Sequence, residues 1–157
     1  MDAITLLKAD HKKVSKLFRE YKAAHKANRA NRTEIIGKVI EELSVHAAIE
    51  EKIFYPAVRA EVPDADDDVL ESLEEHHVLK WTLAELAAID LSDERYEAKV
   101  TVLMEEVRHH VDEEENDWFP KVRDALGRKR LSEIGAQLEA AKKKAPRTPQ
   151  PDAVAGR

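Results

Sequence analysis

Cysteine is absent from this 157-residue sequence, and glycine occurs only four times. The absence of cysteine excludes a disulfide framework, a thiolate zinc site, an iron–sulfur cluster and a cysteine nucleophile. Scarce glycine combined with 37% charged residues favours long helices over turn-rich folds, so we expect an all-α protein. A chain of this length has room for one ordinary domain.

Long apolar runs are also lacking. No run approaches the roughly 20 residues of a membrane span, and the start, MDAITLLKADH, lacks the basic segment and apolar core of a signal peptide. We therefore expect a cytoplasmic protein with no membrane partner.

Basic residues are fewer than acidic ones, 26 against 32, and they are unevenly distributed. Residues 121–157 carry a net charge of +6, which leaves −12 for residues 1–120. An acidic body cannot neutralise phosphates, so the charge pattern argues against a nucleic-acid partner.

Apolar residues at spacings of three and four predict four long helices joined by short connections, which indicates an up-down-up-down four-helix bundle. The expected helices are Ala3 to Ala27, a second helix capped by Thr33 and kinked or ended by Pro56, Asp66 to Ile89, and a fourth that is capped by Ser92 and lies before Pro120.

The C-terminal residues predict a shorter accessory helix, Arg130 to Lys144, followed by a disordered tail from Pro146. We therefore divide the chain into a bundle (1–127), an accessory fifth helix (128–145) and a disordered C-terminal tail (146–157).

An internal repeat contains most of the histidines. Residues 46–56 read HAAIEEKIFYP and residues 110–120 read HVDEEENDWFP, and they share the histidine, glutamates at +4 and +5, two aromatic residues and the final proline. The same comparison pairs His11 with His76. Each half therefore has a lone histidine on its first helix and a His-x-x-x-Glu pair on its second.

The repeat predicts a metal site inside the bundle. A spacing of four puts histidine and glutamate on one helix face about 6 Å apart, and alternating helix direction brings the four histidines to one level. Neutral imidazoles and ionised carboxylates cannot satisfy one another in an apolar core. Imidazole with carboxylate suits iron, zinc or manganese, and two glutamates able to bridge suit a pair of ions.

The ordered set His, His-x-x-x-Glu, His, His-x-x-x-Glu, over about residues 4–120, resembles the haemerythrin-like family of His-His-Glu cation-binding (HHE) domains. The resemblance implies two non-haem iron ions with an oxo or hydroxo bridge, and bridging roles for the two glutamates. The implied metal ligands are His11, His46, Glu50, His76, His110 and Glu114.

One position departs from the oxygen-carrying members of that family. Lys80 stands where they have a further histidine, four residues after the one on the third helix. This departure argues against reversible oxygen transport and implies more open positions on one iron.

Two histidines compete for the third-helix position. We favour His76 over His77, because His76 places Leu79 at the core position one turn on, whereas His77 places Lys80 there. His109 lies outside the register of the repeat, and we expect it on the flank of its helix.

Neighbours of the expected ligands have weaker roles in this interpretation. Glu51 and Glu115 lie about 100° off the ligand face and are expected to support the site from outside or to be solvated. Phe54 and Trp118 are expected to cover it, with ordinary core packing as an equal alternative. Tyr55 is expected to point to the side opposite His46.

We therefore expect a di-iron protein that binds or reacts with dioxygen, hydrogen peroxide or nitric oxide. No side chain stands out as a nucleophile or general base, so any catalysis would be catalase-like peroxide breakdown or diatomic-gas chemistry at the metal. The alternative is a non-catalytic iron-storage or iron- and oxygen-sensing module, and a third reading is a zinc-bound or metal-free bundle. A monomer or weak homodimer is expected.

Overall fold

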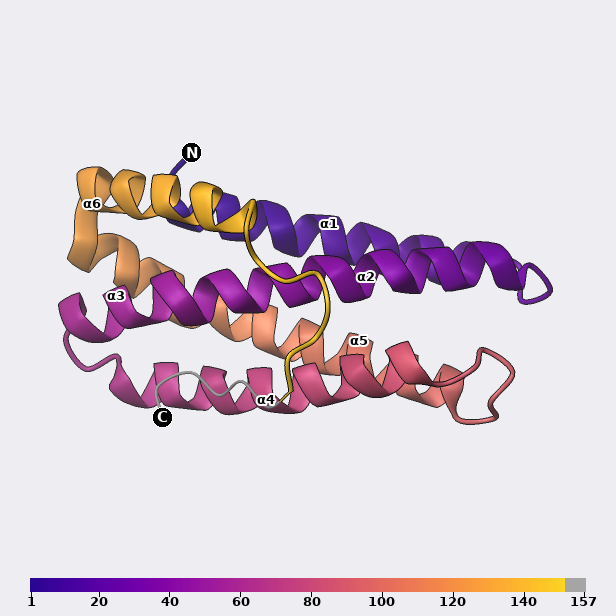
Figure 1. Cartoon of the computed structure of the whole chain (residues 1–157). Coiled ribbons are helices and arrows are strands. Elements are labelled where there is room, and N and C mark those ends of the chain that lie inside the picture. The colour runs from indigo at the N-terminus through magenta and orange to yellow at the C-terminus, as the bar shows by residue number, and fades with distance from the viewer. Residues whose placement is uncertain (152–157) are drawn as a thin grey trace.

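The computed structural model describes residues 1–151, and every regular element within them is a helix. Four long helical columns run up, down, up and down (Figure 1), which confirms the predicted all-α bundle. In the described part of the chain, no helix is both long and apolar enough to cross a membrane. In chain order the elements are α1 (Ala3–Ala23), α2 (Arg29–Ile49), η1 (Glu50–Phe54), α3 (Tyr55–Glu61), α4 (Asp66–Ala88), α5 (Tyr96–Asp112), η2 (Glu113–Trp118) and α6 (Phe119–Lys142).

The first connection is placed differently from the prediction. Helix α1 ends at Ala23 rather than Ala27, because Ala24 already has an extended backbone. Asn28, not Thr33, caps α2, and its side chain accepts a hydrogen bond of 3.1 Å from the backbone amide three residues on. Asparagine competes well for this position because its short side chain reaches the unpaired amides of the first turn.

The predicted cap of the fourth helix is also wrong. Helix α5 begins at Tyr96, after Arg95, which makes no side-chain capping bond. Ser92 instead donates from its amide and its hydroxyl to the Asp90 carboxylate, at 2.8 and 2.6 Å, so it belongs to the preceding turn.

Pro56, which we expected to kink or end its helix, and Pro120, expected just beyond the fourth helix, both lie within continuous helical columns. Pro56 and Pro120 each follow a turn of π-helix, η1 and η2, in which a backbone amide donates to the carbonyl oxygen five residues back. At the start of the next helical segment proline needs no amide partner, so the chain continues as α3 and as α6.

The predicted accessory helix is the second part of α6. Gly127, with φ 75° and ψ 172°, turns the chain by a conformation that is essentially restricted to glycine. Beyond it α6 doubles back along α1 (Figure 1) and ends at Lys142 rather than Lys144. Residues 146–151 form no helix, and the tail prediction for residues 152–157 lies outside the described residues. The division of the chain into three parts stays a prediction.

A layer of polar side chains divides the apolar core into two clusters. On α1, Leu7 belongs to one cluster and Val14 to the other, and the buried His11 lies between them. Buried histidines occupy the same level on α2, α4 and α5. The two clusters hold the four columns together on both sides of this layer.

The glycine corner can be tested with one pair of variants. Gly127→Ala should lower the free energy of unfolding by about 1–3 kcal/mol, because alanine is strained at this backbone conformation. Gly37→Ala should raise it by roughly 0.5–1 kcal/mol, since Gly37 is inside α2 and an added Cβ meets no atom within 4 Å. Denaturant titrations measure both, and equal stability of the two variants would contradict the described corner.

Candidate metal centre

The structure brings all six predicted side chains together in the polar layer. Each is at most 7% exposed although all are polar or charged. They come from α1, α2, η1, α4, α5 and η2, so every bundle column contributes. The set is His11, His46, Glu50, His76, His110 and Glu114.

One group of four ligand atoms lies between η1, η2, α4 and α5. The Nε2 atom of His76 is 3.2 Å from Glu50 Oε1 and 3.2 Å from His110 Nε2. His110 Nε2 in turn contacts Glu114 Oε1. Ligand atoms of all four residues lie within 4.8 Å of one another, a spacing that one metal ion could hold together.

A second group lies beside the first and shares one of its members. His11, His46 and Glu114 also offer ligand atoms within 4.8 Å of one another. Glu50 reaches this group as well, because its Oε1 is 3.0 Å from His46 Nε2. The two glutamates are therefore placed between two ion positions, as bridging carboxylates would be.

Carboxylates on the outside of the layer hold each ring in orientation. Every one of the four histidines has its Nδ1 atom against a carboxylate, which directs its Nε2 atom inward. The pairs are His11 with Glu115 (2.6 Å), His46 with Asp10 (3.0 Å), His76 with Glu51 (3.0 Å) and His110 with Glu75 (2.8 Å).

These outer carboxylates follow the internal repeat. Glu51 and Glu115 directly follow the two bridging glutamates, and the expectation that they support the site from outside agrees with their contacts. Asp10 and Glu75 directly precede the two lone histidines. Sequence reasoning missed these two, although the pairing of His11 with His76 places them at equivalent positions.

The inward-facing atoms form a set of acceptors without enough donors. An imidazole that donates from Nδ1 presents a lone pair at Nε2. In the described chain, three of these buried atoms have no hydrogen-bond partner: His11 Nε2, Glu50 Oε2 and Glu114 Oε2. The Nε2 atom of His46 lies only against the Glu50 carboxylate. Buried polar atoms are almost always satisfied, so this donor set fits a pair of cations.

Protons compensate for part of this charge when no metal is bound. Burial disfavours the charged form of His46, but the adjacent Glu50 carboxylate raises its pKa to about 10, and Glu114 likewise raises the pKa of His110. Burial lowers the pKa of His11 to about 4. Burial and the charge of Glu50 raise the pKa of Glu114 to about 7. Metal ions entering the layer would displace such protons.

The comparisons with known proteins agree with this geometry. Residues 2–122 match the family model described as the Hemerythrin HHE cation binding domain. The chain belongs to the haemerythrin HHE family. The predicted resemblance is thereby confirmed, and the buried histidine and glutamate cluster lies within the matched residues.

This haemerythrin-like chain is similar to three proteins of different sources. The crystal structure of a haemerythrin HHE cation-binding domain-containing protein from Mycobacterium kansasii superposes with a TM-score of 0.79 at 26% identity, covering 92% of this chain and 86% of that one. An uncharacterised haemerythrin-like protein of Schizosaccharomyces pombe is 24% identical, covering 92% and 70%. A protein named DNA nickase from Nostoc sp. (strain PCC 7120) is 28% identical, and the chain spans 40% of its length.

The structure separates the histidines that sequence reasoning left in competition. His76 is 1% exposed and belongs to the first group, whereas His77 is only half-buried and belongs to neither. His109 has a side chain that is 65% exposed, and its Nε2 lies 2.9 Å from Glu113 on the flank of the helix. The ligand role of the six inner residues stays a prediction.

Tyr55 is the site residue that sequence reasoning misplaced. It lies nine residues after His46, about 180° away on an uninterrupted α-helix, but the π-turn η1 adds a residue and rotates it toward the cluster. Its hydroxyl lies 3.1 Å from both His76 Nε2 and Glu114 Oε1. It lies 3.3 Å from both Glu50 Oε1 and His110 Nε2, so it reaches every member of the first group.

The equivalent position in the other half is Phe119, which makes the two groups chemically different. Its ring lies parallel to that of His11, with centroids 6.1 Å apart. Phe54 and Trp118, expected as a cover, are buried and pack on each other at 5.9 Å. One group therefore faces a phenol oxygen and the other an apolar ring.

Lys80 does not point into the cluster. It is buried, and its ammonium group donates to Glu51 at 2.9 Å, which is the carboxylate that holds His76. The position of the additional histidine in oxygen carriers is thus occupied here by a lysine that supports a histidine from outside.

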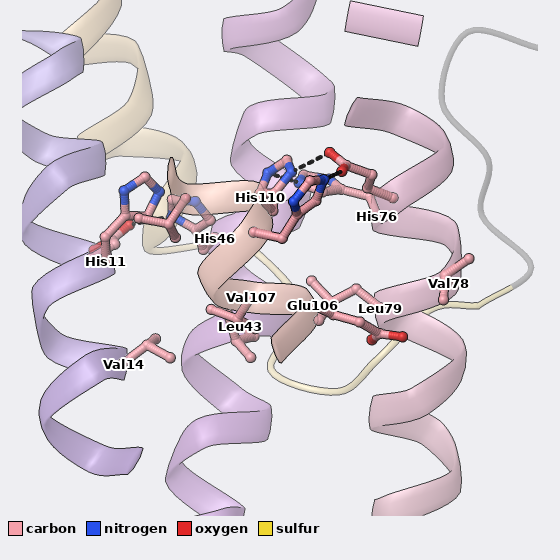
Figure 2. A pocket seen from close by; sticks show the side chains of 14 residues that line it. His11, Val14, Leu43, His46, His76, Val78, Leu79, Glu106, Val107 and His110 are labelled. Carbon is pink, nitrogen blue, oxygen red and sulfur yellow. Dashed lines mark hydrogen bonds and ion pairs between the residues drawn. The ribbon is translucent and has the colours of Figure 1, made fainter. Parts of the chain in front are cut away.

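A cavity of about 190 Å³ lies against the four histidines (Figure 2). The apolar side chains of Val14, Leu43, Leu79 and Val107 line it below the rings. Three carboxylates, those of Asp10, Glu75 and Glu106, also belong to the lining. Several of these apolar residues belong to the core cluster that contains Val14, so the cavity lies between that cluster and the polar layer. Its lining includes the exposed Val78 on α4 and His109 on α5.

Metal binding should stabilise this fold, because ligands from all four columns are absent as a set in the unfolded chain. Protein purified from iron-supplemented cells should melt about 5–10 °C above the chelated protein when free iron exceeds its dissociation constant a hundredfold. His76→Ala should abolish most of this difference, and His77→Ala should preserve it. Calorimetry measures both, and identical melting of loaded and chelated wild-type protein would contradict the metal site.

Proposed function

We propose that the chain is a di-iron protein that binds and reacts with a small oxidant, with hydrogen peroxide preferred over dioxygen and nitric oxide. The proposal rests on one observation. Two adjoining groups of histidine and glutamate side chains share Glu114, and they lie in a buried layer that contains unsatisfied acceptor atoms. Iron bound there would supply redox and Lewis-acid chemistry.

The two groups would offer different numbers of ligand atoms to their ions. Glu50, His76, His110 and Glu114 would hold one ion, and the phenol oxygen of Tyr55 adds a fifth ligand atom within reach. His11 and His46 would hold the other with only the two bridging glutamates. The second position would therefore retain more room for an external ligand.

The cavity supports reaction with a small, weakly polar molecule. Its apolar walls exclude bulk water from the side of the layer that the histidines face. Three carboxylates also line the cavity: Asp10 and Glu75, which hold histidine rings, and Glu106, whose Oε2 is buried without a hydrogen-bond partner in the described chain. Burial raises the pKa of Glu106 above its usual range.

A non-catalytic iron-storage or sensing module is the alternative, and the same ligand set supports it. DNA nicking, which names the Nostoc relative, belongs to a chain of which this one spans 40%. The net charge of −12 over residues 1–120 disfavours docking on a phosphate backbone. We therefore keep peroxide chemistry as the proposal.

Activity of the iron-loaded protein tests the proposal against its alternative. The wild-type chain should bind about two iron ions and consume hydrogen peroxide, and its reduced form should oxidise irreversibly in air. Glu114→Ala should lose both the second ion and peroxide consumption, because it removes the shared carboxylate. His77→Ala is the matched control and should retain both. Two bound ions without peroxide consumption would favour storage or sensing, and a releasable dioxygen adduct would favour transport.

The role of Tyr55 can be read from the visible spectrum. If its oxygen binds ferric iron, the loaded protein should show a phenolate charge-transfer band that Tyr55→Phe removes while the iron content stays at two. Tyr96→Phe changes a buried tyrosine in the apolar cluster that contains Val14, outside the polar layer, and should leave the band intact. A spectrum that is unchanged in Tyr55→Phe would show that the phenol is only a hydrogen-bond donor in this layer.

A further inference from the structure

One lysine supports each half of the metal layer from outside. In the half that contains His76, Lys80 donates to Glu51, which holds that histidine. In the half that contains His46, Lys142 donates to Asp10 Oδ1, while Asp10 Oδ2 lies 3.0 Å from His46 Nδ1. The second lysine is 132 positions from its partner in the sequence and comes from a different part of the fold.

Lys142 lies outside the residues that the family model matches, which end at 122. It ends the segment of α6 that follows the Gly127 corner and doubles back along α1. The buried apolar side chains that dock this segment are Leu131, Ile134 and Leu138.

The lack of a side chain at Gly135 allows α6 to pack closely on the start of α1. A Cβ atom at this position would lie 2.1 Å from the backbone oxygen of Met1 and 2.9 Å from the Ala3 nitrogen. The α6 backbone therefore packs directly on the start of α1, the helix that carries Asp10 and His11. This close packing sets the distance over which the Lys142 side chain reaches Asp10.

Asp10 depends on both of its partners. It is 6% exposed, so water does not readily replace a missing hydrogen bond. Without Lys142, one carboxylate oxygen would be left unpaired, and the carboxylate would be free to rotate. Such a rotation would loosen the ring of His46, whose Nε2 faces the second ion position.

We propose that Lys142 is a positioning residue for the ion held by His11 and His46. The C-terminal part of α6 is then a structural component of one ion position and not of the other. This inference rests on the proposed di-iron function and adds a way in which a segment outside the family domain controls one half of the centre.

Iron release into a chelator, followed by native mass spectrometry, tests the inference without using activity. In Lys142→Met one ion should leave about tenfold faster than in the wild type, because loss of a residue that supports a ligand lowers metal affinity by about tenfold or more. A form with one iron ion should therefore accumulate. Anomalous diffraction from that form should place the remaining ion beside His76 and His110. Lys80→Met should give the mirror result, with the remaining ion beside His11 and His46.

Three further variants separate positioning from a general loss of stability. Lys142→Arg should restore slow release, and Lys143→Met should match the wild type because Lys143 is exposed. Gly135→Ala, which shifts the segment and keeps every charge, should accelerate release of the same ion as Lys142→Met. Equal acceleration of both ions, or none, in Lys142→Met would overturn the inference and leave the proposed function intact. A wild-type chain that binds fewer than two ions would overturn both.

Discussion

The pairing of each buried histidine with a carboxylate is the interaction on which the rest of the site depends. Because Nδ1 is held from outside, all four Nε2 atoms are directed into the bundle, where they meet two buried glutamates. Such a layer is costly without cations, since His11 Nε2, Glu50 Oε2 and Glu114 Oε2 are buried without a hydrogen-bond partner in the described chain. The apolar clusters on its two sides supply the packing that keeps it closed.

Two π-turns give the two groups of potential ligands different surroundings. Each turn inserts one residue after Glu50 or Glu114, accommodates a following proline, and rotates the next aromatic residue toward the layer. In one half that residue is Tyr55, whose oxygen reaches four ligand atoms, and in the other it is Phe119, which stacks on His11. A chain with near-symmetric histidine and glutamate side chains thus has one group beside a phenol oxygen and one beside an apolar ring.

Much of this architecture could be predicted from the sequence, because apolar periodicity and the internal repeat both report helix faces. They predicted the four columns and the six residues that the structure brings together. They failed where hydrogen-bond register changes: nothing in the spacing of apolar residues signals a π-turn, so Tyr55 was placed on the wrong side. The contact between Lys142 and Asp10 depends on the Gly127 corner and the packing at Gly135, which no local pattern encodes.

The most direct test of a two-ion centre is anomalous diffraction at the iron edge, from crystals of protein grown with iron. Two peaks of similar height should appear, one enclosed by Glu50, His76, His110 and Glu114 and the other by His11, His46 and Glu114. Both peaks should adjoin the carboxylate of Glu114. A single peak at full iron loading, or peaks outside the histidine layer, would contradict this account of the protein.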